Sequence, residues 1–500
     1  MTDTPQLKLF NSLTRQLEEF QPVHEGEARV YSCGPTVYNY QHIGNMRAYV
    51  FADTLGRTLQ FLGYKLTHVI NITDVGHLTS DADEGEDKME KMAAREGKSA
   101  WDIAKFYQED FERDLARLNV QPKQHPRATE YVDAMIAWGM RIADKHCYEL
   151  DSGLYFDVSS VADYGRLARA VTEDGEGRID TVEGKRNAAD FAIWRKTPAG
   201  ETRQMEWDSP WGRGAPGWHL ECSVMGEALL GFPFDIHTGG IDHREIHHPN
   251  EIAQNQAYCG CGGLDDARHS GAKIWMHNNF LVERSGKMSK SSGEFLRLQL
   301  LIDKGYHPLA YRMMCLQAHY RSELEFSWEG LGAALTRLKR MVMGVRQATG
   351  AAYNQAPNTA LPASPENRAD ALRQAVDHPK LVPLIDKFEA ALLDDLNTAV
   401  ALTALEEVIA TKKVPVDQKA TLARAMLWPL GLEALPREEF RLRPKDAVVT
   451  EAEIEDALER RRDARAQKDF ATSDAIRDEL AGKGVEVMDG DPLGWEWKLG

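Results

Sequence analysis

The spacing of hydrophobic residues near the beginning of the chain predicts a strand, a helix and a second strand. The first strand is expected to end near Tyr31, just before a Gly-Pro turn. Apolar residues then recur at three- and four-residue steps, the pattern of one helical face: Ala48, Phe51, Leu55, Leu59 and Leu62. This helix is expected to end at Gly63, and residues 65–71 are predicted to form the second strand. The unit has the length of a right-handed parallel crossover, so we predict an α/β fold with a parallel sheet.

The later pattern divides the chain into further segments. Residues 147–217 break the helical rhythm: 153–158 looks like a strand, and 172–187 is polar and contains glycine. We interpret this region as an insertion between two halves of the parallel sheet. Beyond residue 291 the sequence is strongly helical, and the segment 349–368, with its Ala, Pro, Asn and Ser, predicts a linker or a long surface loop.

The last unit, from about residue 450, combines a basic run with a short strand and two tryptophans. Arg460–Lys468 is the basic run, Val485–Met488 the strand, and Trp495 and Trp497 follow. A charge run is usually a solvated face. Basic side chains near exposed aromatic rings also suit RNA bases and backbone, so both interpretations stay open.

Composition narrows the class of protein. A chain of 500 residues with 43% hydrophobic side chains can bury two or three cores, so we expect several domains. The 6 cysteines form no regular framework and are expected to be reduced. A net charge of −17 argues against a general nucleic-acid coat but leaves room for local basic surfaces. The acidic run within residues 81–90 reads as a solvated loop.

The hydropathy pattern also bears on location. No apolar run approaches the roughly 20 residues that span a bilayer, and the first residues lack a basic flank followed by an apolar stretch. We therefore expect no membrane association and a cytoplasmic location.

Thiol, imidazole and carboxylate side chains are candidates for a metal site. Two thiolates, one imidazole and one carboxylate suit tetrahedral zinc. The candidate ligands are Cys33, Cys222, His247 and Glu251. The long separation of the two cysteines is no spacing signature, and a lone buried cysteine is more often a small hydrophobe. A purely structural role therefore stays open.

The sequence around His247 and His248 does not decide which of the two histidines is the imidazole ligand. Proline is favoured at the first position of a helix and restricts the residue before it. Pro249 therefore predicts that His247 lies just outside a helix, with Glu251 in its first turn, and His248 competes with His247 as a ligand. Cys259 and Cys261 have no partner pair nearby, so we interpret them as structural or incidental.

A second group of residues suits a nucleotide. Helix N-termini attract phosphate because their first N–H groups are unpaired and the helix dipole is positive there. His42 and Asn45 lie where the first helix is expected to begin. Gly239 and Gly240 follow a short apolar strand and admit a close ligand, and Asp242 just past them suits a ribose hydroxyl.

Two lysines complete the nucleotide hypothesis. Lys287 and Lys290 lie three residues apart in a polar loop after Gly286. Phosphoryl or adenylyl transfer needs cations matched to the charge that develops on phosphate oxygens, and a mobile loop can close on that charge after substrate enters.

Six ordered motifs together indicate a family. They are Tyr31–Tyr38 (YSCGPTVY), His42–Asn45 (HIGN), Asn71–Asp74 (NITD), Gly217–Cys222 (GWHLEC), His247–Glu251 (HHPNE) and Lys287–Ser291 (KMSKS). In this order they closely resemble the cysteinyl-tRNA synthetase family, which belongs to the class I aminoacyl-tRNA synthetases. The likeness runs from about residue 8 to the C-terminus.

The resemblance implies a division into domains. It implies a Rossmann-type catalytic domain over residues 1–310 with an inserted segment at about 120–217. A mainly α-helical C-terminal half would follow, with a helical stem-contact or bundle region at 311–440 and an anticodon-binding domain at 441–500.

The resemblance also implies the roles of site residues. One zinc ion per chain would be held at the four candidate ligands already named, and Lys290 would contact ATP. Two residues depart from the family pattern. Asn45 replaces a second histidine and can donate hydrogen bonds but cannot carry charge, so we expect binding to survive. Pro249 stands where a glutamate is common, which bears on the local helix boundary.

The expected reaction follows from the problem of telling cysteine from serine. Zinc binds a thiolate far better than an alcohol, so the resemblance implies that zinc takes the substrate sulfur directly. Thr73, Trp218 and His237 are expected to shape the pocket, although the tryptophans of 207–218 could instead anchor a loop. ATP with Mg²⁺, L-cysteine and tRNA(Cys) are the expected substrates, and the protein is expected to be a monomer.

Two other functions compete with this one. A related ligase would pass activated cysteine to a small amine, but such enzymes lack the anticodon-binding end. A non-catalytic tRNA-binding protein would keep only the fold, but here both lysines and all four candidate ligands are intact.

Overall fold

A four-stranded parallel sheet lies at the centre of the molecule. The computed structural model describes residues 6–75, 88–168, 184–260, 262–283, 296–355, 368–490 and 493–499. The strand order is β10-β9-β3-β4, and all neighbours are parallel. The bounds are β3 (Glu27–Ser32), β4 (Lys65–Ile70), β9 (Phe234–Gly240) and β10 (Ala272–Asn278). The predicted α/β parallel-sheet fold is confirmed, and the outermost N-terminal hairpin pairs β1 (Lys8–Asn11) with β2 (Gln16–Glu19).

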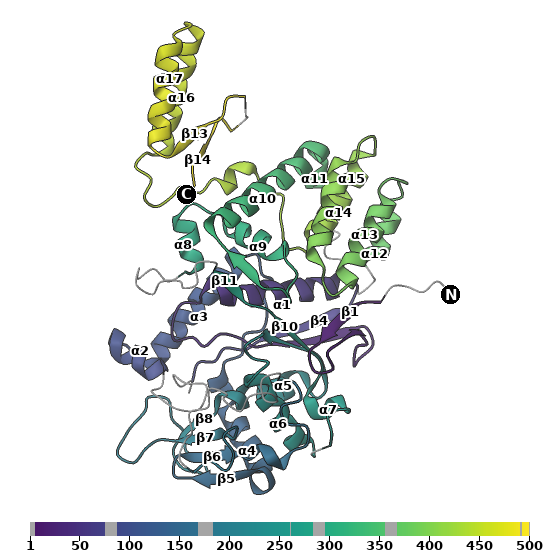
Figure 1. Ribbon diagram of the computed structural model, residues 1–500, viewed down its shortest axis with the longest axis vertical. Helices are drawn as coiled ribbons and strands as arrows, with labels where there is room; N and C mark the ends of the chain where they lie inside the picture. Colours follow the sequence, from purple (N-terminus) through teal and green to yellow (C-terminus); the bar gives the residue numbers. More distant parts are fainter. Residues whose placement is uncertain are drawn as a thin grey trace.

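Helix α1 (Ile43–Phe61) connects β3 to β4 and covers one face of this sheet (Figure 1). Its N-cap is His42, whose side chain accepts a hydrogen bond from the Gly44 N–H. Helices α5 (Trp218–Leu230) and α6 (His247–Cys259) cover the opposite face (Figure 1). The strand–helix–strand unit predicted from the hydrophobic spacing is therefore confirmed.

The segment between the two halves of the sheet contains its own small antiparallel sheet. Its order is β5-β6-β7-β8. The bounds are β5 (Cys147–Leu150), β6 (Gly153–Phe156), β7 (Phe191–Lys196) and β8 (Gly214–Pro216). The helices before it are α2 (Lys88–Glu96), α3 (Ala100–Arg117) and α4 (Val132–His146). Ser99 caps α3 by accepting from the Asp102 N–H, as expected of a Ser-x-x-Asp start.

The chain after the sheet is mainly helical. The short helix α7 (Ala267–Ser270) still precedes β10. Four short elements then lead into the helical part: β11 (Leu281–Glu283), α8 (Leu298–Asp303), α9 (Pro308–Leu316) and β12 (Leu324–Phe326). The helical bundle contains α10 (Trp328–Thr349), α11 (Ala352–Gln355), α12 (Arg368–Ala375), α13 (Val382–Leu393), α14 (Thr398–Ala410) and α15 (Val416–Leu427). Between α13 and α14 the chain reverses through Asp395 and Leu396, both at positive φ.

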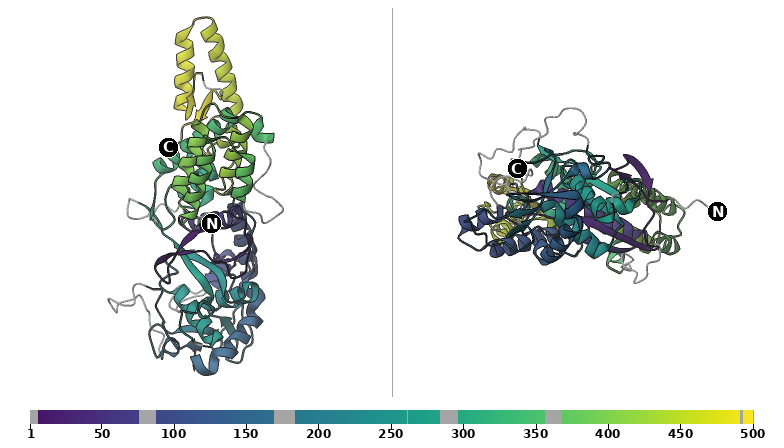
Figure 2. Two further views of the ribbon diagram at one scale, coloured as in Figure 1. Left: turned by 90° about the vertical axis from the view of Figure 1, so that its right-hand side faces the viewer. Right: turned by 90° about the horizontal axis from the view of Figure 1, so that it is seen from below.

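The C-terminal unit is a helical hairpin with a two-stranded sheet, and it projects from the bundle (Figure 2). It comprises α16 (Glu451–Ala466), α17 (Phe470–Gly482), β13 (Val485–Val487) and β14 (Trp495–Trp497). The two tryptophans are 0% and 6% exposed and form the core of this unit. The proposed pairing of basic residues with exposed aromatic rings is therefore wrong for Trp495 and Trp497, because so small a unit needs both rings to build a core.

A buried ion cluster ties α1 to the helical half. The Asp53 carboxylate lies 2.7 Å from Arg57 Nε, 2.7 Å from Arg312 Nη2 and 3.5 Å from Lys123 Nζ. The two guanidinium groups also donate to backbone carbonyls of residues 118, 119, 428 and 430. These carbonyls follow the ends of α3 and α15, where the helix dipole is negative, so they help to offset the surplus positive charge.

Replacing this carboxylate should destabilise the protein strongly. We expect Asp53→Asn to lower the free energy of unfolding by about 3–5 kcal/mol, because buried cations lose their counter-ion. Asp456 forms the same i,i+4 pair with Arg460, but both side chains are more than half exposed. Asp456→Asn should therefore change stability by less than about 1 kcal/mol in urea unfolding. Equal effects of the two substitutions would contradict the assignment of Asp53 as a stabilising centre.

Candidate functional site

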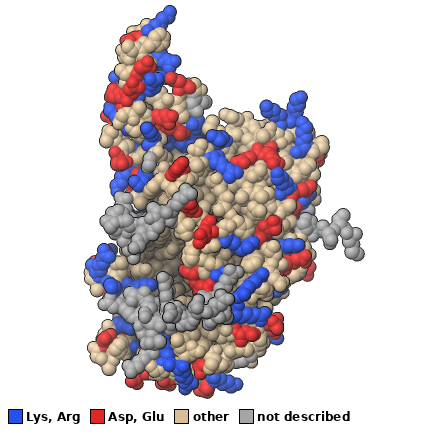
Figure 3. Space-filling model, in the orientation of Figure 1, with Lys and Arg blue, Asp and Glu red and all other residues tan. Residues whose placement is uncertain are grey.

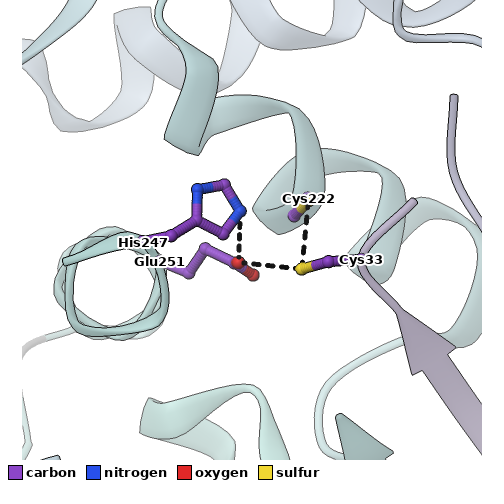
Figure 4. A group of neighbouring side chains, drawn as sticks. All are labelled: Cys33, Cys222, His247 and Glu251. Carbon is purple, nitrogen blue, oxygen red and sulfur yellow. Dashed lines mark hydrogen bonds and ion pairs between the residues drawn. The ribbon is translucent and has the colours of Figure 1, made fainter. Parts of the chain in front are cut away.

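Four potential metal ligands from distant parts of the chain meet at one edge of the sheet. Cys33 follows β3, Cys222 lies in α5, and His247 and Glu251 lie in α6. Their ligand atoms all lie within 4.8 Å of one another, and all four side chains are buried (Figure 4). The two Sγ atoms are 4.0 Å apart, and tetrahedral zinc with Zn–S bonds of about 2.3 Å would place them about 3.8 Å apart. Donor type and spacing therefore both fit zinc.

The structure corrects the expected position of His247. It is the first residue of α6 and not a residue outside the helix. Pro249 fits in the first turn because the N–H groups there have no intrahelical partner to lose. Glu251 is consequently one turn further on, with Oε1 2.9 Å from His247 Nε2. The i,i+4 spacing places both side chains on one helix face.

The cluster has the charge pattern of a cation site. A hydrogen bond with Cys33 lowers the pKa of Cys222 to about 6. Burial alone would raise the pKa of Glu251, but His237 and His247 outweigh it and lower that pKa to about 2. Burial and Cys222 raise the pKa of the Cys33 thiol well above its usual value. Burial lowers the pKa of His247, but Glu251 and Cys222 outweigh it and raise that pKa to about 10. The buried thiolate and carboxylate thus favour a positive charge at this point, which a divalent cation would also supply.

A second overlapping set of ligands shares Cys33 and Glu251 but adds His237 and His248. His237 Nε2 lies 2.8 Å from Glu251 Oε2, where it can orient that carboxylate. His248 is held between Cys33 Sγ at 3.2 Å and His277 Nε2 at 2.8 Å. The first set contains two thiols and the second only one, so the first suits zinc better.

The side chains that support the cluster are not identified by sequence reasoning. His219 Nδ1 lies 2.9 Å from His247 Nδ1, which leaves His247 Nε2 directed at the ligand group. Asn71 Oδ1 accepts from the Gly34 N–H at 2.8 Å and fixes the backbone beside Cys33. A side chain at position 34 would collide with the Asn71 carbonyl at 1.5 Å. His219 lies in the motif GWHLEC and Asn71 in the motif NITD. Membership of these motifs was the sequence signal that could have identified the two residues.

A cavity of about 290 Å³ adjoins the cluster and contains the predicted nucleotide residues. His42, Asn45, Gly240, Asp242 and Cys33 line it together. Glycine at position 240 allows the Asp242 carboxylate to lie close to the backbone, because a Cβ at this position would be only 2.3 Å from that carboxylate. The two glycines were expected to follow the strand, but they are its last two residues, and Gly239 is buried there.

The two residues at the start of α1 differ in their roles. His42 Nδ1 accepts from the Gly44 N–H at 3.0 Å, and burial lowers the pKa of His42. The neutral ring therefore carries its proton on Nε2, which can donate to an anion. Asn45 is exposed, and its Nδ2 donates to Gln41 Oε1 at 3.0 Å.

The predicted cysteine-pocket residues surround the metal cluster. The Trp218 ring is 4.3 Å from the His247 ring, between ring centroids. Thr73 Oγ1 donates to Glu221 Oε2 at 2.7 Å. Asp74, the last residue of the NITD motif, accepts from the Thr129 N–H and hydroxyl and so holds the short helix at residues 128–131.

Some predicted residues lie outside the described parts of the chain. They are the motif 287–291 with Lys287 and Lys290, residues 81–87 of the acidic run, residues 172–183 of the polar segment, residues 356–367 of the predicted linker, and Cys261. Their proposed roles stay predictions from the sequence. Among the described helices, none is long and apolar enough to cross a membrane.

Comparisons with known proteins place this arrangement in a class. The family model "tRNA synthetases class I (C) catalytic domain" matches residues 19–336, and "Cysteinyl-tRNA ligase anticodon binding domain" matches residues 450–492. A solved methionyl-tRNA synthetase from Mycobacterium tuberculosis covers 81% of this chain and 92% of its own, with a TM-score of 0.51 and 13% identity. The Agrobacterium radiobacter LeuRS complex has a TM-score of 0.53, with 82% and 84% coverage and 12% identity. At these identities the two structures bear on the fold alone. The family model and the fold together place the chain among the class I aminoacyl-tRNA synthetases.

Curated relatives define the family within this class. A cysteine–tRNA ligase of Novosphingobium aromaticivorans is 71% identical over 99% of this chain and 97% of its own length. The cysteine–tRNA ligase of Zymomonas mobilis is 50% identical, with 98% and 97% coverage. The chain belongs to the cysteine–tRNA ligase family, an aminoacyl-tRNA ligase family, and the resemblance inferred from the motifs is confirmed.

Substitution of the neighbouring histidines should identify the imidazole ligand. We expect His247→Asn to weaken zinc binding more than about 100-fold, which exceeds the usual loss from a residue that only supports a ligand. His248→Asn is the matched control, and it should retain close to one zinc per chain in elemental analysis. Loss of zinc from His248→Asn with retention in His247→Asn would assign the metal to the overlapping set.

Proposed function

We propose that this enzyme activates L-cysteine with ATP and transfers it to tRNA(Cys), selecting the amino acid through zinc held by Cys33, Cys222, His247 and Glu251. The observation that carries the proposal is the meeting of these four buried side chains beside the cavity lined by His42 and Asp242. When bound there, zinc would take the cysteine sulfur as a thiolate, a ligand that serine cannot offer as well.

The protein groups around the cavity would position the reactants. The cysteine carboxylate attacks the α-phosphorus of ATP and pyrophosphate leaves, which gives cysteinyl-adenylate. A hydroxyl of the terminal tRNA ribose then attacks the cysteinyl carbonyl carbon, and AMP leaves. This sequence needs no protein nucleophile, because positioning and charge stabilisation are sufficient. His42 would donate from Nε2 to the phosphates, and Asp242 would accept from the ribose.

The remaining roles are assigned by the sequence motifs. Asn45 would add an uncharged donor beside His42, Lys287 and Lys290 would stabilise the pentavalent phosphorus and the departing pyrophosphate, and Mg²⁺ would accompany ATP. Thr73, Trp218 and His237 would enclose the amino acid next to the ligands.

The nucleic-acid partner is supported by the C-terminal unit. Residues 450–492 match the anticodon-binding family, and they form α16, α17 and β13. Lys and Arg side chains are interspersed with Asp and Glu over the face in Figure 3, so local basic positions exist on this acidic chain. Retention of this unit disfavours transfer of cysteine to a small amine.

Amino-acid selection gives the test of the proposed function. The zinc-loaded enzyme should catalyse pyrophosphate exchange with L-cysteine and should prefer it over L-serine by at least about 10⁴-fold in kcat/KM, since shape alone gives only about 10²-fold. Removing zinc should abolish cysteine-dependent exchange, and adding zinc should restore it.

Substitution of Cys147, a cysteine outside the candidate site, is the control for substitution of the candidate ligand Cys222. Cys222→Ser should lose both zinc and activity, whereas Cys147→Ser, in the inserted sheet, should keep both. A chelated enzyme that still charges tRNA with cysteine and rejects serine would refute selection by the metal.

A further inference from the structure

The Arg47 guanidinium joins helix α1 to two separate loops. Nη1 donates to the Asn279 carbonyl at 2.8 Å and to the Phe280 carbonyl at 2.5 Å. Nη2 donates to the carbonyls of His319 at 3.3 Å and Ser322 at 2.6 Å. The side chain is in the second turn of α1 and is only 2% exposed. One residue therefore fixes three chain segments relative to each other.

The first of these loops forms a wall of the nucleotide cavity. Asn279 and Phe280 line that cavity together with His42, the N-cap of α1, and Asn45 in its first turn. The Phe280 carbonyl also accepts from the Leu324 N–H at 3.0 Å, at the start of the β11–β12 pairing. The width of the cavity between α1 and this wall is thus set by contacts that include Arg47.

The second loop, residues 319–322, is anchored on its other side. Asp395 accepts from the Tyr320 hydroxyl at 2.6 Å and from Arg321 Nε at 2.7 Å. Since Asp395 lies between α13 and α14, the loop is held to the bundle as well as to Arg47. Residues 279 and 280 of the cavity wall are therefore connected, through Arg47 and the loop 319–322, to the helical bundle.

Arg47 pairs with backbone groups and not with an acid. In the described parts of the chain, no carboxylate lies within 4.0 Å of its guanidinium. A buried guanidinium that only stabilised the fold would normally be expected to have a carboxylate partner, as Arg57 has Asp53. The planar fork of arginine can serve two pairs of carbonyls at once, which the single ammonium of lysine cannot do in the same geometry.

We propose that Arg47 is a positioning residue for the adenylation step, holding the Asn279–Phe280 wall at the distance from the start of α1 that ATP requires. The inference rests on the proposed use of this cavity for ATP. Its physical basis is that a shift of about 1 Å in bound reactants can cost about 100-fold in rate.

A matched pair of substitutions on the same helix tests this role. Arg47→Lys should lower kcat/KM for ATP in pyrophosphate exchange by about 10- to 100-fold and change KM for L-cysteine by less than about twofold. Arg57 is also buried and also donates to two backbone carbonyls, but those carbonyls lie away from this cavity. Arg57→Lys should therefore lower the unfolding midpoint while leaving kinetics per folded active site within about twofold of wild type.

Further variants keep the test decisive. If Arg47→Lys does not fold, Arg47→Gln avoids an unpaired buried charge and can still bond one loop, and it should show the same ATP-specific loss. Equal kinetic effects of the Arg47 and Arg57 variants, or parallel rises in KM for ATP and for cysteine, would overturn the proposal and leave Arg47 a purely structural residue.

Failure of the proposed function can be told apart from failure of the proposed role of Arg47. If wild-type protein shows no cysteine-dependent exchange, the proposed reaction is wrong, and calorimetry with a non-hydrolysable ATP analogue still tests Arg47. Weaker binding to Arg47→Lys than to Arg57→Lys would support the positioning role, and equal binding would overturn it.

Discussion

The meeting of Cys33, Cys222, His247 and Glu251 is the constraint on which the active-site side of the structure depends. A thiolate and a carboxylate are unfavourable in a dry interior unless a cation neutralises them. A cation held by these four side chains would link the carboxyl end of β3 to two helices of the opposite layer, α5 and α6. Supporting contacts from His237, His219 and Asn71 orient these groups and link the metal hypothesis to the packing of the sheet.

The short connection from β3 to α1 joins the four candidate metal ligands to the adjoining cavity. Cys33 directly follows the strand and His42 caps the helix, so a single loop places a candidate metal ligand and the start of a helix on one rim. The two substrates would then meet where the carboxylate of the amino acid can approach the α-phosphate. The buried Asp53 cluster attaches α1 to the helical half away from this cavity. Arg47 attaches the start of α1 to the loops beside the cavity and so holds this rim in place.

The sequence predicted what depends on local pattern. The periodicity of Ala48–Leu62 identified α1, and the motif resemblance selected four ligands that the fold brings together. It failed where the outcome depends on tertiary contacts. The place of His247 inside α6 follows from its pairing with Glu251, and burial of Trp495 follows from the small core of the last unit. No local pattern indicates that Arg47 would reach residues 279 and 322.

X-ray absorption at the zinc edge, with and without L-cysteine, tests the central claim most directly. The resting enzyme should show two sulfur ligands at about 2.3 Å, one nitrogen and one oxygen. Addition of L-cysteine should raise the number of sulfur ligands to three, whereas L-serine should leave it at two. A sulfur count that does not change with cysteine, or a protein without zinc that is fully active, would contradict recognition of the substrate through a metal–thiolate bond.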